Sequence, residues 1–258
     1  QYEKSIFWFR PFGEFKYFKT LKKKDWIKLV TIGLIGGSIP FILFFRGLKI
    51  STSGSAAFIH KTMFLYVAVL AYMFLKEKFN WKIIVGSLAL IAGNFLFLKP
   101  SFSGFNLGDL MIFVATLFWA AENTLSKHTL KNVAPKIVAF SRMFFGSFFI
   151  LVYLVATGSF VQIFSLTQNQ LLWSIVPSVT LLMYLLTWYT GLKDVPVTIA
   201  TSILLLGSPI TTLFNVWHAG VVLSLQQVFG IVLLVIGVVT FLYSVTGFKL
   251  PEPTKFFV

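Results

Sequence analysis

The sequence predicts an all-α membrane protein, a polytopic bundle of transmembrane helices, and three observations support this. Of the 258 residues 57% are hydrophobic and only 12% are charged, whereas a soluble domain carries about 25% charged residues. The mean hydropathy is +0.85. The apolar residues form runs of about 20, the length that a helix needs to cross about 30 Å of hydrocarbon. A water-soluble fold is excluded because its surface would lack polar cover.

Eight runs qualify as transmembrane helices. The third is short, so it would stand nearly upright or thin the bilayer locally. Three prolines, Pro40, Pro177 and Pro209, interrupt helix hydrogen bonding and are candidate bend points. The predicted spans are residues 27–47, 52–75, 82–98, 109–128, 135–157, 169–191, 196–217 and 226–246.

The basic residues predict the orientation. Residues 1–26 interleave aromatic side chains with Lys and Arg, which is typical of a loop at the cytoplasmic interface. If that loop is cytoplasmic, three of the 22 Lys and Arg residues lie on the outer side of the membrane: Arg46, Lys49 and Lys99. Two more, Lys61 and Arg142, fall within spans. The remainder lie inside, as in most membrane proteins. The net charge of +14 therefore reflects cytoplasmic connections and does not indicate a nucleic-acid partner.

The chain contains an internal repeat. Residues 45–98 align with 189–242 at a constant offset of 144, with ten identities that include the pairs Gly86/Gly230 and Gly93/Gly237. Within each copy the two glycines are seven residues apart, on one helix face where backbones can approach closely. The copies start on opposite sides of the membrane, so the repeat is inverted. Chance similarity between two apolar hairpins is the alternative interpretation.

The layout resembles the EamA family of the drug/metabolite transporter superfamily. Residues 45–98 resemble the last three helices of one family repeat, and Leu75-Lys76-Glu77-Lys78 stands where the family often has a Leu-Gly-Glu turn. The stretches GDLMIFVATLFWAAENTLSKHTL and SRMFFG resemble the first two helices of the second repeat, and Leu206-Gly207-Ser208-Pro209 resembles the Ser-Pro of the ninth helix. The chain departs from the pattern at Leu65, in place of Pro, and at Val221, in place of Glu.

The resemblance implies two inverted five-helix repeats. Eight helices are visible, so two more are expected upstream of Gln1, and a chain without them is not expected to transport alone. The implied organisation is a basic aromatic cytoplasmic loop (1–26), the last three helices of the first repeat (27–99), a complete second repeat (100–247) and a cytoplasmic tail (248–258).

Three charged residues lie well inside predicted spans: Lys61, Glu122 and Arg142. Such charges are costly in a bilayer and usually face the bundle interior or a wet cavity. At a rise of about 1.5 Å per residue, Glu122 and Arg142 lie at nearly the same depth on successive helices. They either pair with each other or contact a substrate. Lys61 has no obvious acidic partner; it either binds an anionic group, extends toward the interface or pairs with an upstream helix.

Polar and aromatic residues at helical spacing supplement these charges. They could line a wet cavity between helices, or they could simply hydrogen-bond one helix to another. The histidines show no metal-binding spacing and the chain has no cysteine, so neither a metal nor another cofactor is expected. The candidate substrate-binding residues are Lys61, Glu122, Arg142, Trp119, Asn123, Tyr184, Trp188, Asn215 and His218.

These features favour a secondary transporter that moves a small organic metabolite, such as an amino acid or a related compound, by alternating access. The chain shows no cluster of catalytic groups near one interface, so it is not expected to be an enzyme. The alternative is a membrane scaffold or an embedded lipid-modifying enzyme. The expected partners are a small solute and the lipid bilayer, with a second copy of the chain as a further candidate. The expected location is a prokaryotic plasma membrane, with the C-terminus cytoplasmic.

Overall fold

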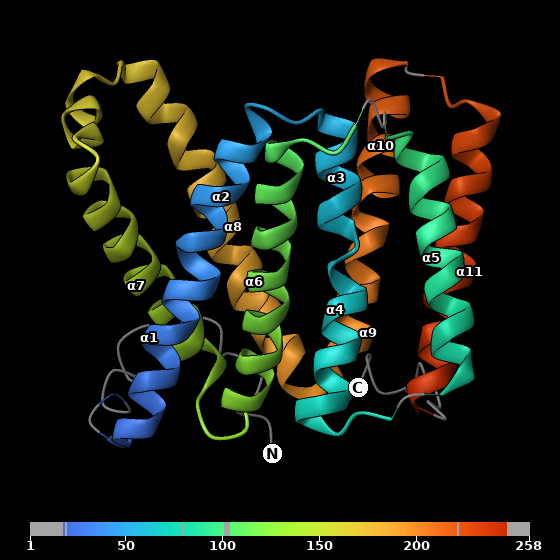
Figure 1. The fold of residues 1–258 in the computed structure, drawn as a ribbon, viewed down its shortest axis with the longest axis horizontal. Helices are drawn as coiled ribbons and strands as arrows, with labels where there is room; N and C mark the ends of the chain where they lie inside the picture. The colour runs from blue at the N-terminus through green and yellow to red at the C-terminus, as the bar shows by residue number, and fades with distance from the viewer. Residues whose placement is uncertain (1–17, 19, 79, 101–103, 221, 247–258) are drawn as a thin grey trace, which may run out of the picture.

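The computed structural model describes residues 18, 20–78, 80–100, 104–220 and 222–246, and the described chain is helical with no strand. Most of the predicted loop 1–26 and the whole predicted tail 248–258 lie outside the described residues. The helices stand side by side and run between two opposite edges of the molecule (Figure 1). Their bounds are α1 Lys23–Gly37, α2 Ile39–Leu48, α3 Ser53–Lys61, α4 Met63–Leu70, the π-helix η3 Ala71–Leu75, α5 Trp81–Leu98, α6 Leu107–Thr129, α7 Pro135–Ala156, the 3-10 helix η4 Ser159–Ser165, α8 Gln168–Asp194, α9 Val197–Ile203, the 3-10 helix η5 Leu204–Leu206, α10 Gly207–Ala219 and α11 Leu225–Thr246.

The prediction of a membrane helix bundle is confirmed. Seven segments of the described chain are long and apolar enough to cross a bilayer, and each agrees with a predicted span to within about one helical turn. Several are interrupted, so α1 with α2, α3 with α4 and η3, and α9 with η5 and α10 each form one span. These seven spans are Lys23–Leu48, Ser53–Leu75, Trp81–Leu98, Pro135–Ala156, Gln168–Asp194, Val197–Ala219 and Leu225–Ser244.

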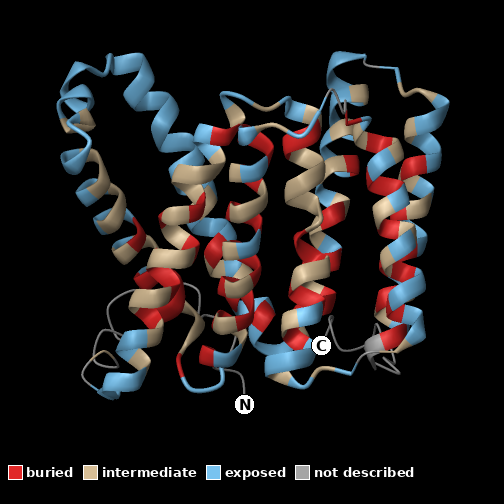
Figure 2. Ribbon diagram, in the orientation of Figure 1, coloured by how far each residue is buried: buried red, intermediate tan, exposed pale blue. Residues whose placement is uncertain are grey.

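The remaining predicted span corresponds to α6, which is long enough but more polar than the others. Its 23 residues extend about 34 Å at helical rise. It packs against α1, α2, α3, α4, α8 and α9, and its buried positions include Glu122, Asn123, Thr124 and Ser126. A helix surrounded by protein can carry polar side chains that a lipid-facing helix cannot. Figure 2 shows buried residues concentrated on α6 and on the faces of its neighbours.

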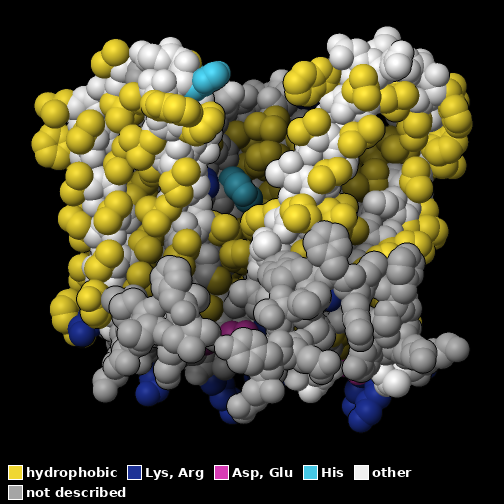
Figure 3. Space-filling model, turned by 180° about the vertical axis from the view of Figure 1, so that it is seen from behind, with side chains coloured by type: hydrophobic (Ala, Val, Ile, Leu, Met, Phe, Trp, Pro, Cys, Tyr) yellow, Lys and Arg dark blue, Asp and Glu magenta, His cyan; other side chains and the backbone are white. Residues whose placement is uncertain are grey.

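The outward surfaces of the bundle are apolar. Of the 27 residues of α8 only Leu185, Tyr189 and Leu192 are buried, and large apolar side chains such as Phe164 and Trp217 are exposed. In Figure 3 hydrophobic side chains cover both sides of the molecule, while Lys and Arg side chains gather along its lower edge. This distribution matches a bundle that contacts lipid along its length and water at its ends.

The helices α5 and α11 form an antiparallel pair with reciprocal contacts. A Cβ on Gly93 would lie 2.9 Å from the carbonyl oxygen of Gly230, and one on Gly237 would lie 3.1 Å from that of Gly86. The repeat offset exchanges these two contacts. A two-fold axis perpendicular to two antiparallel helices produces such reciprocal contacts. The α5–α11 pair is therefore packed as expected for an inverted repeat. The predicted count of five helices per repeat stays a prediction.

Breaks in the helices also fall at equivalent positions of the repeat. The break between α3 and α4 falls at Thr62, and the equivalent position 144 residues later is Leu206, the last residue of η5. Pro209 follows this second break, and Pro40 follows the break between α1 and α2, whereas α8 runs as one helix through Pro177. The break at Thr62 was not predicted because no Pro is found there. Instead, the Thr62 hydroxyl donates to the carbonyl of Ile59. Both repeats therefore carry a discontinuous helix at the same place.

Candidate functional site

A hollow lies between the two sides of the molecule. Figure 3 shows it opening toward the upper edge, away from the edge where Lys and Arg side chains gather, with a histidine and a basic side chain inside it. A smaller groove of about 130 Å³ lies between α2, α7 and α8 and is lined by Gly37, Phe41 and Arg142, among others. The predicted candidate residues fall into four groups in the structure.

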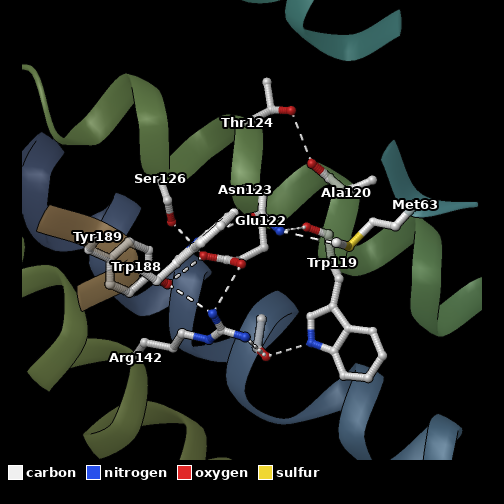
Figure 4. A network of polar contacts seen from close by, with 11 residues as sticks. Met63, Trp119, Ala120, Glu122, Asn123, Thr124, Ser126, Arg142, Trp188 and Tyr189 are labelled. Atoms are coloured by element: carbon white, nitrogen blue, oxygen red, sulfur yellow. Dashed lines mark hydrogen bonds and ion pairs between the residues drawn. The ribbon is translucent and has the colours of Figure 1, made fainter. Parts of the chain in front are cut away.

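Five residues from four helices form a buried ionic network (Figure 4). Glu122 Oε2 lies 3.3 Å from Arg142 Nη1, and the exposed fractions of the two side chains are 0% and 9%. The Tyr189 hydroxyl donates to Glu122 Oε1 at 2.6 Å and accepts from Arg142 Nη1 at 3.1 Å. The Ser126 hydroxyl also donates to Glu122 Oε1, and Arg142 Nη2 donates to the carbonyl of Gly36 at 3.0 Å. The structure thus brings Glu122 and Arg142 together as a buried ion pair, in which Glu122 Oε2 contacts Arg142 but accepts no hydrogen bond from the described residues.

Gly36 in α1 makes room for this pair. A Cβ at this position would lie 2.3 Å from Glu122 Cγ, which is closer than any real contact. The same carbonyl that binds Arg142 also accepts from Trp119 Nε1 at 3.1 Å. Sequence reasoning missed this role of Gly36. The available signal was the cluster of Gly33, Gly36 and Gly37, which is unusual within one helix and indicates close packing.

A second set of side chains continues from Trp119 toward α8. Asn123 Nδ2 donates to the carbonyl of Trp119 at 2.8 Å, and Trp188 Nε1 donates to Asn123 Oδ1 at 3.1 Å. The ring of Trp188 is stacked with that of Tyr184, with centroids 5.9 Å apart. Trp119 and Asn123 are buried, whereas Tyr184 is 40% exposed. These four predicted residues therefore form one chain of contacts, which we call the aromatic surface, with Tyr184 at its exposed end and Trp119 buried.

Lys61 lies apart from the Glu122–Arg142 pair. Its Nζ donates to the carbonyl of Leu204 at 2.9 Å, so it joins the break in one repeat to the break in the other. A Cβ on Gly207, the first residue of α10, would lie 4.0 Å from this Nζ. No carboxylate in the described part of the chain forms an ion pair with Lys61. The ammonium group is thus held by a backbone carbonyl and keeps donors for another acceptor.

His60, the residue before Lys61, is a half-buried residue that the sequence did not single out. Its ring packs edge-on against Trp119 and Phe44, with centroids 4.9 and 5.5 Å away. Its Nδ1 is buried and has no hydrogen-bond partner among the described residues. An isolated histidine gives no signal in a single sequence, so only its surroundings reveal it.

The structure brings neither Asn215 nor His218 to the ionic network or to Lys61. Both lie on α10 and are exposed, and the ring of His218 stacks with that of Phe214 on the same helix. Among the described residues no three His, Cys, Asp or Glu side chains are close enough together to hold a metal ion. The two charged places and the aromatic surface between α6 and α8 are therefore the candidate site.

A family model described as the EamA-like transporter family matches residues 5–99 and 106–243. The chain belongs to the EamA-like transporter family. Membership makes the chain an integral membrane protein of a transporter family, whose members handle small solutes within a lipid bilayer.

Relatives and a solved structure agree with this family. The chain is 26% identical over 234 residues to "Uncharacterized transporter YyaM" of Bacillus subtilis (strain 168), a match that covers 86% of this chain and 75% of the relative. It is 28% identical over 121 residues to an uncharacterized transporter of Archaeoglobus fulgidus, which covers 47% of this chain and 37% of that relative. A crystal structure of another protein has a TM-score of 0.67 at 18% identity over 85% of this chain and 78% of that chain, which supports the fold.

Proposed function

We propose that this protein is a secondary transporter that moves a small organic metabolite by alternating access. The observation that carries the proposal is the contact between Lys61 Nζ and the carbonyl of Leu204, where the discontinuous helices of the two repeats meet. Transporters built from inverted repeats bind their substrates near the bilayer midplane, at discontinuous helices, because the freed backbone groups and helix termini there can contact a polar solute.

The charges of the site favour a substrate with an anionic group. Glu122 and Arg142 neutralise each other and are held by Tyr189 and Gly36, so we assign them to holding α1, α6, α7 and α8 together. Lys61 contributes the unmatched charge. A carboxylate would bind this ammonium group, and the aromatic surface of Trp119, Tyr184 and Trp188 would contact an apolar side chain. Amino acids and related carboxylates fit both features.

The proposed location is a prokaryotic plasma membrane, with the Lys- and Arg-rich edge of the bundle and the C-terminus on the cytoplasmic side. The gathering of basic side chains along one edge in Figure 3 supports this orientation, because Lys and Arg collect on the cytoplasmic side.

Transport by proteoliposomes tests the proposal. The full-length protein would be reconstituted and assayed for counterflow of radiolabelled amino acids and other small carboxylates. Lys61→Ala should reduce transport of the accepted solute about tenfold or more, since a charge-assisted hydrogen bond to the solute is lost. Lys61→Arg should retain part of the activity. Lys99→Ala, which removes an exposed bond to Ser224, is the matched control and should transport normally. Undiminished transport by Lys61→Ala would contradict the proposed site.

A further inference from the structure

Two charged side chains hold the connection between α8 and α9, residues 192–198. Glu77 follows η3, and its Oε1 accepts from the backbone N–H of Val197 at 2.8 Å, while its Oε2 accepts from the hydroxyl of Thr198 at 2.6 Å. Lys127, near the end of α6, donates from Nζ to the carbonyls of Leu192, Lys193 and Val195 at 2.8, 2.9 and 2.8 Å. We call these two residues and the connection the 192–198 clamp.

The clamp satisfies backbone groups that the chain leaves unsatisfied. Pro196 precedes α9 and provides no side-chain cap, so the free N–H groups of the first turn bind Glu77 instead. Lys127 performs the complementary task for the carbonyls at the end of α8. Bonds between a charged group and the backbone are the stronger kind of hydrogen bond. Glu77 belongs to the first repeat and α9 to the second, so this cap exists only while the two repeats are together at this end.

The equivalent start of α3 is built differently. Position 52, equivalent to Pro196, is Thr, and its own side chain accepts from the backbone N–H of Ser55 at 3.2 Å. In the sequence, the position equivalent to Glu77 is Val221, which cannot accept a hydrogen bond through its side chain. The helix α3 therefore keeps its cap whether or not the repeats separate. In contrast, α9 loses its cap when Glu77 moves away.

We infer that Glu77 and Lys127 are gating residues, which close the pathway at the Lys-rich edge and must release residues 192–198 before a solute can pass there. The clamp stabilises the arrangement in which the hollow opens toward the opposite edge, as in Figure 3. The inference rests on the proposed alternating access. It adds a cause of the preferred state. At the Lys-rich edge Glu77 of the first repeat caps a helix of the second, while Lys127 holds the end of α8 within the second repeat. The opposite edge has cross-repeat bonds of its own, from Lys99 to Ser224 and from Ser51 to Asp109, but there α3 keeps a cap within its own segment.

Thiol accessibility tests the clamp without a known substrate. The chain contains no cysteine, so Ser202→Cys introduces a single thiol. Ser202 is fully buried, and its hydroxyl donates to the carbonyl of Ile199 in its own helix. It lies one turn beyond Thr198 on the same face. A membrane-impermeant maleimide would be added to inverted membrane vesicles, in which the Lys-rich edge faces the reagent. Glu77→Ala or Lys127→Ala should raise the rate of Ser202→Cys labelling about tenfold or more, since several charge-assisted bonds are lost.

Matched variants separate gating from general damage. Thr52→Ala removes the equivalent cap of α3 and should leave labelling from this side unchanged, and Lys78→Ala controls for charge beside Glu77. Each variant would first be shown to elute as a single species in size-exclusion chromatography. Equal labelling rates with and without Glu77 and Lys127, or an equal increase in Thr52→Ala, would overturn the inference. Faster labelling without any solute transport would uphold the clamp and count against the proposed function, so the two failures are distinguishable.

Discussion

The two charged places inside the bundle are built in opposite ways. The charges of Glu122 and Arg142 lie 3.3 Å apart and are buried, with hydrogen bonds from Tyr189 to Glu122 and from Arg142 to the carbonyl of Gly36. Lys61 is only partly buried and binds a single backbone carbonyl. A charge that stabilises a membrane protein needs a matched partner, because an unmatched charge in a low-dielectric interior costs several kcal/mol. A charge kept without such a partner is available for a solute. The comparison separates a structural pair from a binding residue.

The largest effect is expected from breaking the matched pair. Arg142→Met leaves the carboxylate of Glu122 buried with only two hydroxyl partners, and we expect it to lower the free energy of unfolding by about 3–5 kcal/mol. Thermal unfolding followed by size-exclusion chromatography in detergent would show this as a large fall in midpoint temperature. The double variant Glu122→Gln/Arg142→Met removes both charges and should recover much of the loss. If the single and double variants are equally unstable, the charges are not coupled.

A smaller effect is expected from filling the space beside the pair. Gly36→Ala places a methyl group 2.3 Å from Glu122 Cγ, so the side chains must shift, and overpacking of this kind costs about 1–3 kcal/mol. Gly191→Ala is the matched control, because no atom of the described chain lies within 4 Å of a Cβ there and Ala favours a helix. The same unfolding assay should show a lower midpoint for Gly36→Ala and an unchanged or higher one for Gly191→Ala. A normal midpoint for Gly36→Ala would mean that the pair is loosely packed.

The sequence predicted the pair better than it predicted the space around it. Helical rise alone placed Glu122 and Arg142 at the same depth, and hydropathy placed the membrane spans to within about one turn. Depth is independent of how a helix is rotated about its axis, which explains this success. Rotation decides that Gly36 faces Glu122 and that the exposed side of α10 carries Asn215 and His218. A single sequence constrains rotation weakly when every face is apolar.

The contact between Lys61 and Leu204 illustrates a different limit. The residues are 143 positions apart, and the contact exists because two discontinuous helices meet at their breaks. The repeat alignment places position 62 opposite position 206, so the symmetry was visible in the sequence. The break at Thr62 itself was not, since it lacks the proline that marks most helix interruptions. Tertiary contact, rather than local propensity, therefore sets this part of the site.

The smallest effect on stability, and the sharpest contrast, is expected at Lys61. Lys61→Met keeps an unbranched side chain that is one heavy atom shorter, and it removes the charge. One bond to a carbonyl is lost, but so is the cost of an unmatched cation. We expect the free energy of unfolding to fall by no more than about 1 kcal/mol, or to increase. The unfolding midpoint should therefore stay nearly the same or rise. Transport of a carboxylate should nevertheless be lost in the counterflow assay. Were Lys61→Met as unstable as Arg142→Met, Lys61 would be a structural charge like Arg142, and the division between the two charged places would be wrong.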